Sequence, residues 1–146
     1  MLSIEKIYRE KEQKILCAIN NGIGEYHYYR DLYELMVVFS AKVRTLKRTL
    51  KIKKMYREIE EKLLNHIMKN ENDFNSDRLY YIMLSYYMGK IKGEKNIPRT
   101  KKVIKMYNQL EKNLLTDNNY FELYEIVKSF DLGKNKGSRG TFLIKN

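Results

Sequence analysis

The chain has few of the residues that build metal centres and disulfides, and none of its apolar runs is long. It holds a single cysteine, Cys17, so no internal disulfide can form, and we expect a reducing, intracellular compartment. The two histidines, His27 and His66, have no cysteine or carboxylate at metal-ligand spacing, which argues against a metal site. The longest uncharged apolar run, residues 35–41, is far too short to span a bilayer, so we expect no membrane contact.

Groups that carry out catalysis are also missing from the sequence as recognisable sets. No nucleophile stands beside a base at a familiar spacing, and no pair of carboxylates suggests acid–base work. The glycines at 133–137 lack the Gly-Lys-Ser/Thr ending of a phosphate-binding loop. We therefore predict a protein that is not an enzyme and that needs no cofactor or metal.

What the chain has in excess is positive charge and tyrosine. Its 29 Lys and Arg against 18 Asp and Glu give a net charge of +11, which favours nucleic acid or another acidic partner. Its 13 tyrosines suit the edges of cores and interfaces, because each has an apolar ring and a polar hydroxyl. Biased codon usage in an AT-rich genome is an alternative explanation for both.

Apolar residues at spacings of three and four predict helices along most of the chain. The first covers 3–20. The second starts near His27 and either runs unbroken to about Lys69 or bends near Lys51. The third covers 77–91, with Ser76 as its N-cap, and is apolar on nearly all sides, which predicts a central position. The fourth is opened by Pro98. The residues that we expect in the core are Leu32, Leu35, Phe39, Leu84, Tyr107 and Leu110.

The helical spacing of apolar residues becomes ambiguous after Thr116. Residues 120–130 fit either a helix or a strand, and 141–144 are expected to form a short strand. We thus predict an all-α fold, a bundle of four to five helices over 1–116, followed by a small β-prone C-terminal segment over 117–146. No internal repeat and no sustained coiled-coil heptad is evident.

Two clusters of basic residues are candidates for binding nucleic acid through phosphate contacts. The first is expected to form a positive ridge on one helix face, and the second crowds the link between the third and fourth helices. The first comprises Arg44, Lys47, Arg48 and Lys51, and the second comprises Lys90, Lys92, Lys95, Arg99, Lys101, Lys102 and Lys105. The alternative interpretation of each cluster is a solvated face without a ligand.

Three segments resemble one family. They are 23–27 leading into an apolar helix, Met83-Leu84-Ser85-Tyr86 followed by Lys90-Ile91, and 126–129 followed by 140–145. In this order they resemble the PSF-one-type subunit of the GINS complex, part of the CMG replicative helicase. The family has a tryptophan after its Leu-Leu-Ala-Tyr helix, and this chain has none.

The resemblance implies a scaffold subunit of a DNA replication complex, located in the nucleus and bound to other subunits in a hetero-oligomer. The apolar stripe of the second helix is the expected partner interface, with Tyr28, Leu32, Leu35 and Phe39. Two other functions stay open: a basic nucleic-acid-binding module, such as a small subunit of an RNA-guided interference complex, and a phage-type inhibitor protein.

Overall fold

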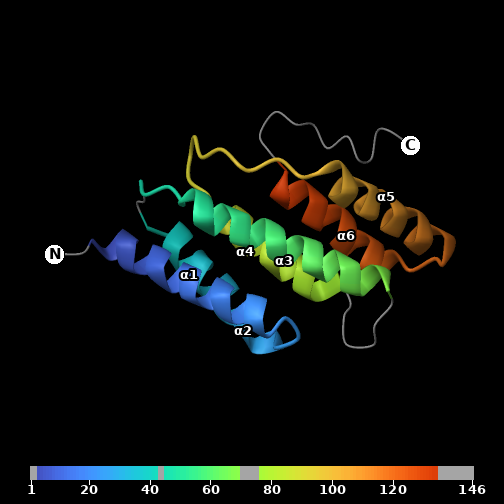
Figure 1. Ribbon diagram of the computed structural model, residues 1–146, viewed down its shortest axis with the longest axis horizontal. Helices are drawn as coiled ribbons and strands as arrows, with labels where there is room; N and C mark the ends of the chain where they lie inside the picture. Colours follow the sequence, from blue (N-terminus) through green and yellow to red (C-terminus); the bar gives the residue numbers. More distant parts are fainter. Residues whose placement is uncertain (1–2, 43–44, 70–75, 135–146) are drawn as a thin grey trace.

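The computed structural model describes residues 3–42, 45–69 and 76–134, and within these it is all-helical. Six helices follow one another along the chain (Figure 1). Their bounds are α1 Ile4–Asn21, α2 Tyr26–Ser40, α3 Leu50–Met68, α4 Ser76–Met88, α5 Lys101–Thr116 and α6 Tyr120–Gly133. The predicted all-α class is therefore confirmed for the described part of the chain.

Local sequence explains where several of these helices begin and end. Ser3, Thr49 and Thr100 are N-caps whose side chains each accept a hydrogen bond from the backbone N–H three residues later. Gly22 is the C-cap of α1, and its backbone N–H donates to the carbonyls of Ala18 and Ile19. Thr100, and not Pro98, is the residue at which α5 starts, and Ser76 is the first residue of α4 and not its cap.

The helices form three antiparallel hairpins: α1 with α2, α3 with α4, and α5 with α6. We call them hairpins 1, 2 and 3. Their first helices, α1, α3 and α5, are the A helices, and α2, α4 and α6 are the B helices. Within the described residues each hairpin contacts only its neighbours along the chain, A helix to A helix and B helix to B helix. This arrangement is a short stack of repeated units, as in solenoid proteins (Figure 1).

The sequence repeats with the structure, which corrects the expectation of no internal repeat. Each A helix carries a tyrosine, then Arg or Asn, then a glutamate three residues after that, and each B helix carries Leu-Tyr followed by a common apolar pattern. The A-helix copies are YREKE at 8–12, YREIE at 56–60 and YNQLE at 107–111. The B-helix copies are LYELMVVF at 32–39, LYYIMLSY at 79–86 and LYEIVKSF at 123–130. A period of about 50 residues is typical of such stacked helical units.

One apolar core runs through all three hairpins. Leu32, Phe39, Tyr107 and Leu110 are buried in it as predicted, whereas Leu35 and Leu84 are only half-buried. The central position predicted for the third helix is confirmed, because α4 contacts α2, α3 and α6.

The other predictions about the elements have different outcomes. Of the two alternatives for the second helix, the unbroken one is wrong, because α2 ends at Ser40 and α3 starts at Leu50, so the break comes before the bend expected near Lys51. Residues 120–130 are helical, so the expected boundary between 116 and 117 falls inside hairpin 3. The strand expected at 141–144 lies outside the described residues.

Candidate interaction surfaces and the buried networks behind them

A buried carboxylate, Glu12, joins hairpin 1 to hairpin 2. Its two oxygens accept bonds from Arg9 Nη1 and Arg48 Nε, both at 2.8 Å, and from the hydroxyl of Tyr56 at 2.5 Å. Arg48 also meets a second buried carboxylate, Glu94, with 3.1 Å between Nη1 and Oε2. We call Arg9, Glu12, Arg48, Tyr56 and Glu94 the Glu12 network.

The same arrangement recurs between hairpins 2 and 3, around Glu60. Arg57 Nη1 and Arg99 Nε donate to its oxygens at 3.0 and 2.8 Å, and the Tyr107 hydroxyl donates at 2.5 Å. These four residues are the Glu60 network. The Glu60 network has no counterpart of Glu94 among the described residues.

The arginines of both networks also hold equivalent backbone carbonyls. Arg9 Nη2 donates to the carbonyl of Gly89 at 2.9 Å, and Arg57 Nη2 donates to that of Gly133 at 2.7 Å. A methyl group at Gly89 would lie 2.3 Å from Arg48 Nη2, so only glycine leaves room for the guanidinium. The two interfaces between hairpins are thus built to one plan.

The charges of the Glu12 network cancel, with two arginines against two glutamates, whereas the Glu60 network has two arginines against one glutamate and keeps one positive charge. Burial raises the pKa of Glu12, but Arg48 and Arg9 favour its charged form more strongly and hold the pKa below the ordinary value. Burial and the flanking Arg99 and Arg57 act on Glu60 in the same way. A buried ion set of this kind fixes the relative position of two hairpins.

Glu111 is the third copy of Glu12 and Glu60. Burial raises the pKa of its carboxyl, and no ion pair to it is formed by the described residues. Asn108 stands where Arg9 and Arg57 stand in the other copies. Among residues 3–42, 45–69 and 76–134, the network is therefore not repeated around Glu111.

The two candidate nucleic-acid clusters are divided by these networks. Arg48 and Arg99 point inward, with side chains that are 0% and 3% exposed, so neither can contact phosphate, and this corrects their assignment. Lys47, Lys51, Lys92, Lys95, Lys101, Lys102 and Lys105 are exposed, and Lys90 is half-buried. Lys102 pairs with Glu61 at 3.3 Å. Arg44 lies outside the described residues. The clusters therefore do not form the two continuous patches that the sequence suggests.

The predicted partner interface is also divided. Leu32 and Phe39 are buried within this chain and cannot reach another subunit. Tyr28 and Leu35 are half-buried and lie against the core. The apolar stripe that suggested a partner is covered mostly by α1 and α4 of the same chain.

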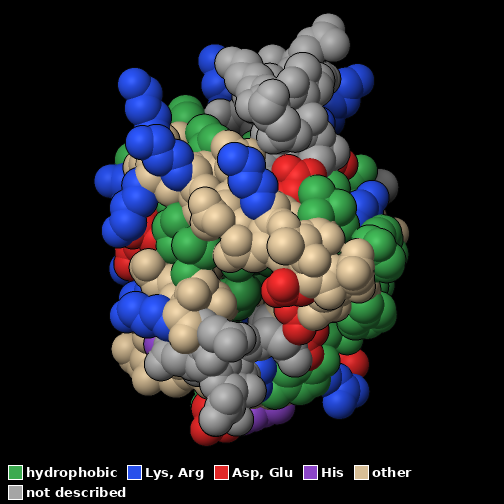
Figure 2. All heavy atoms as spheres, turned by 90° about the vertical axis from the view of Figure 1, so that its right-hand side faces the viewer, with side chains coloured by type: hydrophobic (Ala, Val, Ile, Leu, Met, Phe, Trp, Pro, Cys, Tyr) green, Lys and Arg blue, Asp and Glu red, His purple; other side chains and the backbone are tan. Residues whose placement is uncertain are grey.

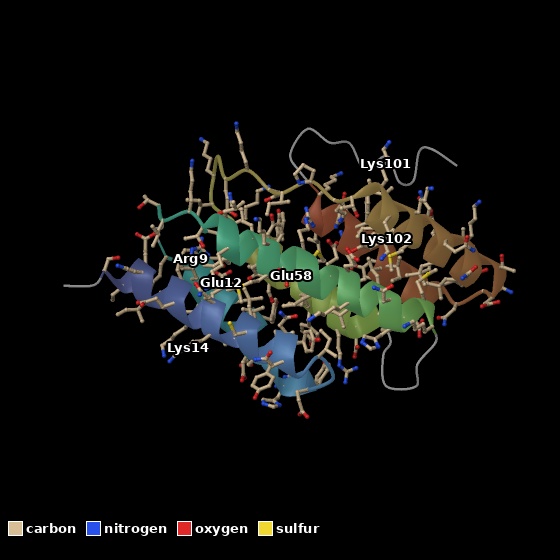
Figure 3. All side chains as sticks on the ribbon, viewed as in Figure 1. Arg9, Glu12, Lys14, Glu58, Lys101 and Lys102 are labelled. Carbon is tan, nitrogen blue, oxygen red and sulfur yellow. The ribbon has the colours of Figure 1, made fainter. Side chains whose placement is uncertain are left out.

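The structure gathers exposed lysine on the A helices, a grouping that the sequence reading missed. Ten lysines of the A helices are exposed, against two exposed glutamates, Glu10 and Glu58. The lysines are Lys6, Lys11, Lys14, Lys51, Lys54, Lys62, Lys101, Lys102, Lys105 and Lys112. In Figure 3, Lys14 projects from the lower edge of the bundle and Lys101 from the upper edge, so these lysines do not all point in one direction. We call the exposed lysine side chains of the A helices together the lysine face.

The B helices carry aromatic rings in place of lysines. Tyr26 and Tyr33 both pack edge-on against Tyr81, with ring centroids 5.9 and 5.7 Å apart, and Tyr80 lies 6.3 Å from Tyr124. In Figure 2, Lys and Arg side chains are most frequent along the left edge and hydrophobic ones along the right edge. The two layers of the stack thus present different chemistry.

Two further findings limit the chemistry. In the described part of the chain, no three His, Cys, Asp or Glu side chains lie close enough to hold a metal ion. None of the described helices is long and apolar enough to cross a membrane.

No family model, no curated protein and no solved structure significantly matches the chain. The class that the fold defines is a helical-hairpin repeat protein.

Proposed function

We propose that this protein is a non-catalytic scaffold of helical hairpins that binds the backbone of a nucleic acid on its lysine face. The observation that carries the proposal is the excess of exposed lysines over exposed glutamates on the A helices. Because the charges of the Glu12 network cancel and the Glu60 network keeps only one positive charge, most of the net charge of +11 lies on other residues, chiefly surface lysines. Lysines on parallel elements meet successive phosphates without reading base sequence.

The test uses fluorescence anisotropy to measure binding of a labelled nucleic-acid duplex and a labelled single strand at several salt concentrations. Replacing Lys54, Lys101 and Lys105 by Gln should weaken binding at least about tenfold and lower the salt slope by about two to three. The matched control replaces Arg30, Lys42 and Lys128 by Gln, which removes the same charge from α2, from the second residue after α2 and from α6. Equal losses in both variants, or no binding at low salt, would contradict the proposal.

A scaffold subunit of a GINS-type replication complex is the more specific function that the sequence resemblance implies. Two of the segments that carry the resemblance, 83–86 and 126–129, overlap the repeated stretch of the B helices, so the repeat offers a second origin for them. Residues 140–145, which carry the rest of the third segment, lie outside the described residues. Co-purification from the native source tests this version: a scaffold subunit brings other replication proteins in fixed stoichiometry, and they resist nuclease treatment.

A further inference from the structure

The outer face of hairpin 1 repeats the positions that hairpins 2 and 3 bury. Ile4 is 59% exposed, whereas its copies Ile52 and Val103 are 2% and 4% exposed. Val38 is 49% exposed, whereas its copies Ser85 and Ser129 are fully buried. Hairpins 2 and 3 each have a preceding hairpin against them, and hairpin 1 has none among the described residues. Its outer face thus repeats, in exposed form, the surface that hairpins 2 and 3 bury against the preceding hairpin.

A groove between α1 and α2 marks this face. It has a volume of about 440 Å³, and its floor is formed by Ile15, Leu35 and Val38. Exposed apolar residues that line a groove and are rimmed by charge mark interaction sites more often than isolated apolar residues do.

The rim of the groove has opposite charges on its two sides. Lys11 and Lys14 stand on the α1 side, and Asp31 and Glu34 stand on the α2 side. All four side chains belong to exposed residues, and none forms an ion pair with another described residue. Since α1 and α2 are antiparallel neighbours, each copy of the protein offers a positive strip beside a negative strip.

We propose that this face binds a second copy of the chain in a two-fold symmetric dimer. A two-fold axis parallel to the helices sets α1 of one copy over α2 of the other, so the strip of Lys11 and Lys14 meets the strip of Asp31 and Glu34 twice. An isologous contact requires this kind of self-complementary surface. The apolar floors meet at the centre, and the four helices form an antiparallel bundle. This packing differs from that between the hairpins of one chain, where A helices contact A helices and B helices contact B helices.

The test uses two charge-reversed variants of the full chain and sedimentation velocity. One variant carries Lys11→Glu and Lys14→Glu, and the other carries Asp31→Lys and Glu34→Lys. The wild type is expected to dimerise with a dissociation constant on the order of micromolar. Each variant alone should be monomeric, because like charges then face each other, and an equal mixture of the two should dimerise again as a heterodimer.

Each other outcome overturns the proposal. A wild type that stays monomeric at about 100 µM leaves a different protein as the occupant of the groove. Variants that still dimerise alone, or a mixture that stays monomeric, rule out the pairing of α1 with α2. All four positions are exposed, so the variants should keep the thermal stability and helix content of the wild type, which circular dichroism checks. The dimer does not depend on nucleic acid, and the measurement is made without it.

Discussion

At the scale of single residues, the protein uses arginine and glutamate where a helical core usually holds leucine. Glu12 and Glu60 are completely buried, and each lies between two guanidinium groups and a tyrosine hydroxyl. Removing an ion from water costs several kcal/mol, so these sets fix the register of the hairpins more surely than they add stability. The cost of breaking one of them is nevertheless large, since the remaining charges are left buried and unpaired.

Glu12→Gln should destabilise the protein by about 3–5 kcal/mol at neutral pH, because Arg9 and Arg48 then lose their carboxylate partner. The pKa of Glu12 is lower in the folded protein than its ordinary value of 4.5, so its contribution is present above pH 4.5 and is lost as the pH falls through the folded-state pKa. The variant should therefore show a flatter loss of stability in acid. Urea unfolding as a function of pH measures both effects, and Glu10→Gln, an exposed neighbour on α1, is the control that should change neither.

Gly89→Ala should cost about 1–3 kcal/mol, because the added methyl meets Arg48 Nη2 and Met36 Sδ, each 2.3 Å from its position. Arg48 cannot move away without releasing Glu12 or Glu94. Thermal unfolding measures the change. At Gly22 the added methyl would make only an ordinary contact of 3.4 Å, so Gly22→Ala should change stability by about 0.5 kcal/mol or less. Equal effects at the two sites would show that the space at Gly89 is not restrictive.

At the scale of the helices, periodicity in the sequence predicts where most of them lie but not where α2 stops. No glycine or proline separates α2 from α3. The chain leaves the helix because its backbone is bonded elsewhere: the N–H groups of Thr45 and Leu46 donate to the carboxylate of Glu5, and the carbonyl of Leu46 accepts from Arg9. These hydrogen-bond partners are about forty residues away along the sequence, so no local sequence pattern predicts where α2 ends.

The buried arginines could not be distinguished from surface lysines by charge counting. Their partners belong to other helices, and composition treats Arg48 and Lys47 alike. A signal was nonetheless present in the sequence: Arg-Thr precedes both α3 and α5, and the Tyr-Arg-x-x-Glu pattern occurs at 8–12 and 56–60. Alignment of the chain against itself would have grouped these residues and set them apart from the lysines.

Three leucines at one repeat position form a matched set for measuring how much burial at that position stabilises each hairpin. Leu16 and Leu64 are 0% exposed, and Leu115 is 50% exposed. Leu64→Ala and Leu16→Ala should each lose about 2–5 kcal/mol, through lost burial and the cavity left behind. Leu115→Ala should lose about 0.5 kcal/mol or less, as at most surface positions. Chemical denaturation of the three variants tests this, and similar losses at all three positions would mean that something covers Leu115 in solution.

At the scale of the whole molecule, the hairpins contact only their neighbours, so local damage should stay local. Arg99→Ala removes the ion pair to Glu60 from the hairpin 3 side and leaves the hydrogen bond from the Tyr107 hydroxyl. Hydrogen exchange of the amides in α5 and α6 should then rise at least about tenfold, while α1 and α2 keep most of their protection. A uniform rise in all six helices would show instead that the three hairpins unfold as one cooperative unit.

The repeated hairpin also has a consequence for ancestry. A pattern copied three times along one chain is the mark of duplication of a shorter coding unit. A single hairpin has an apolar side that it cannot cover alone, so an ancestral unit of that length had to associate with copies of itself in order to fold. The interfaces around Glu12 and Glu60 are the two contacts of this kind between hairpins of the described chain. In the proposed dimer, the groove of hairpin 1 makes the same kind of contact, between two copies of one hairpin.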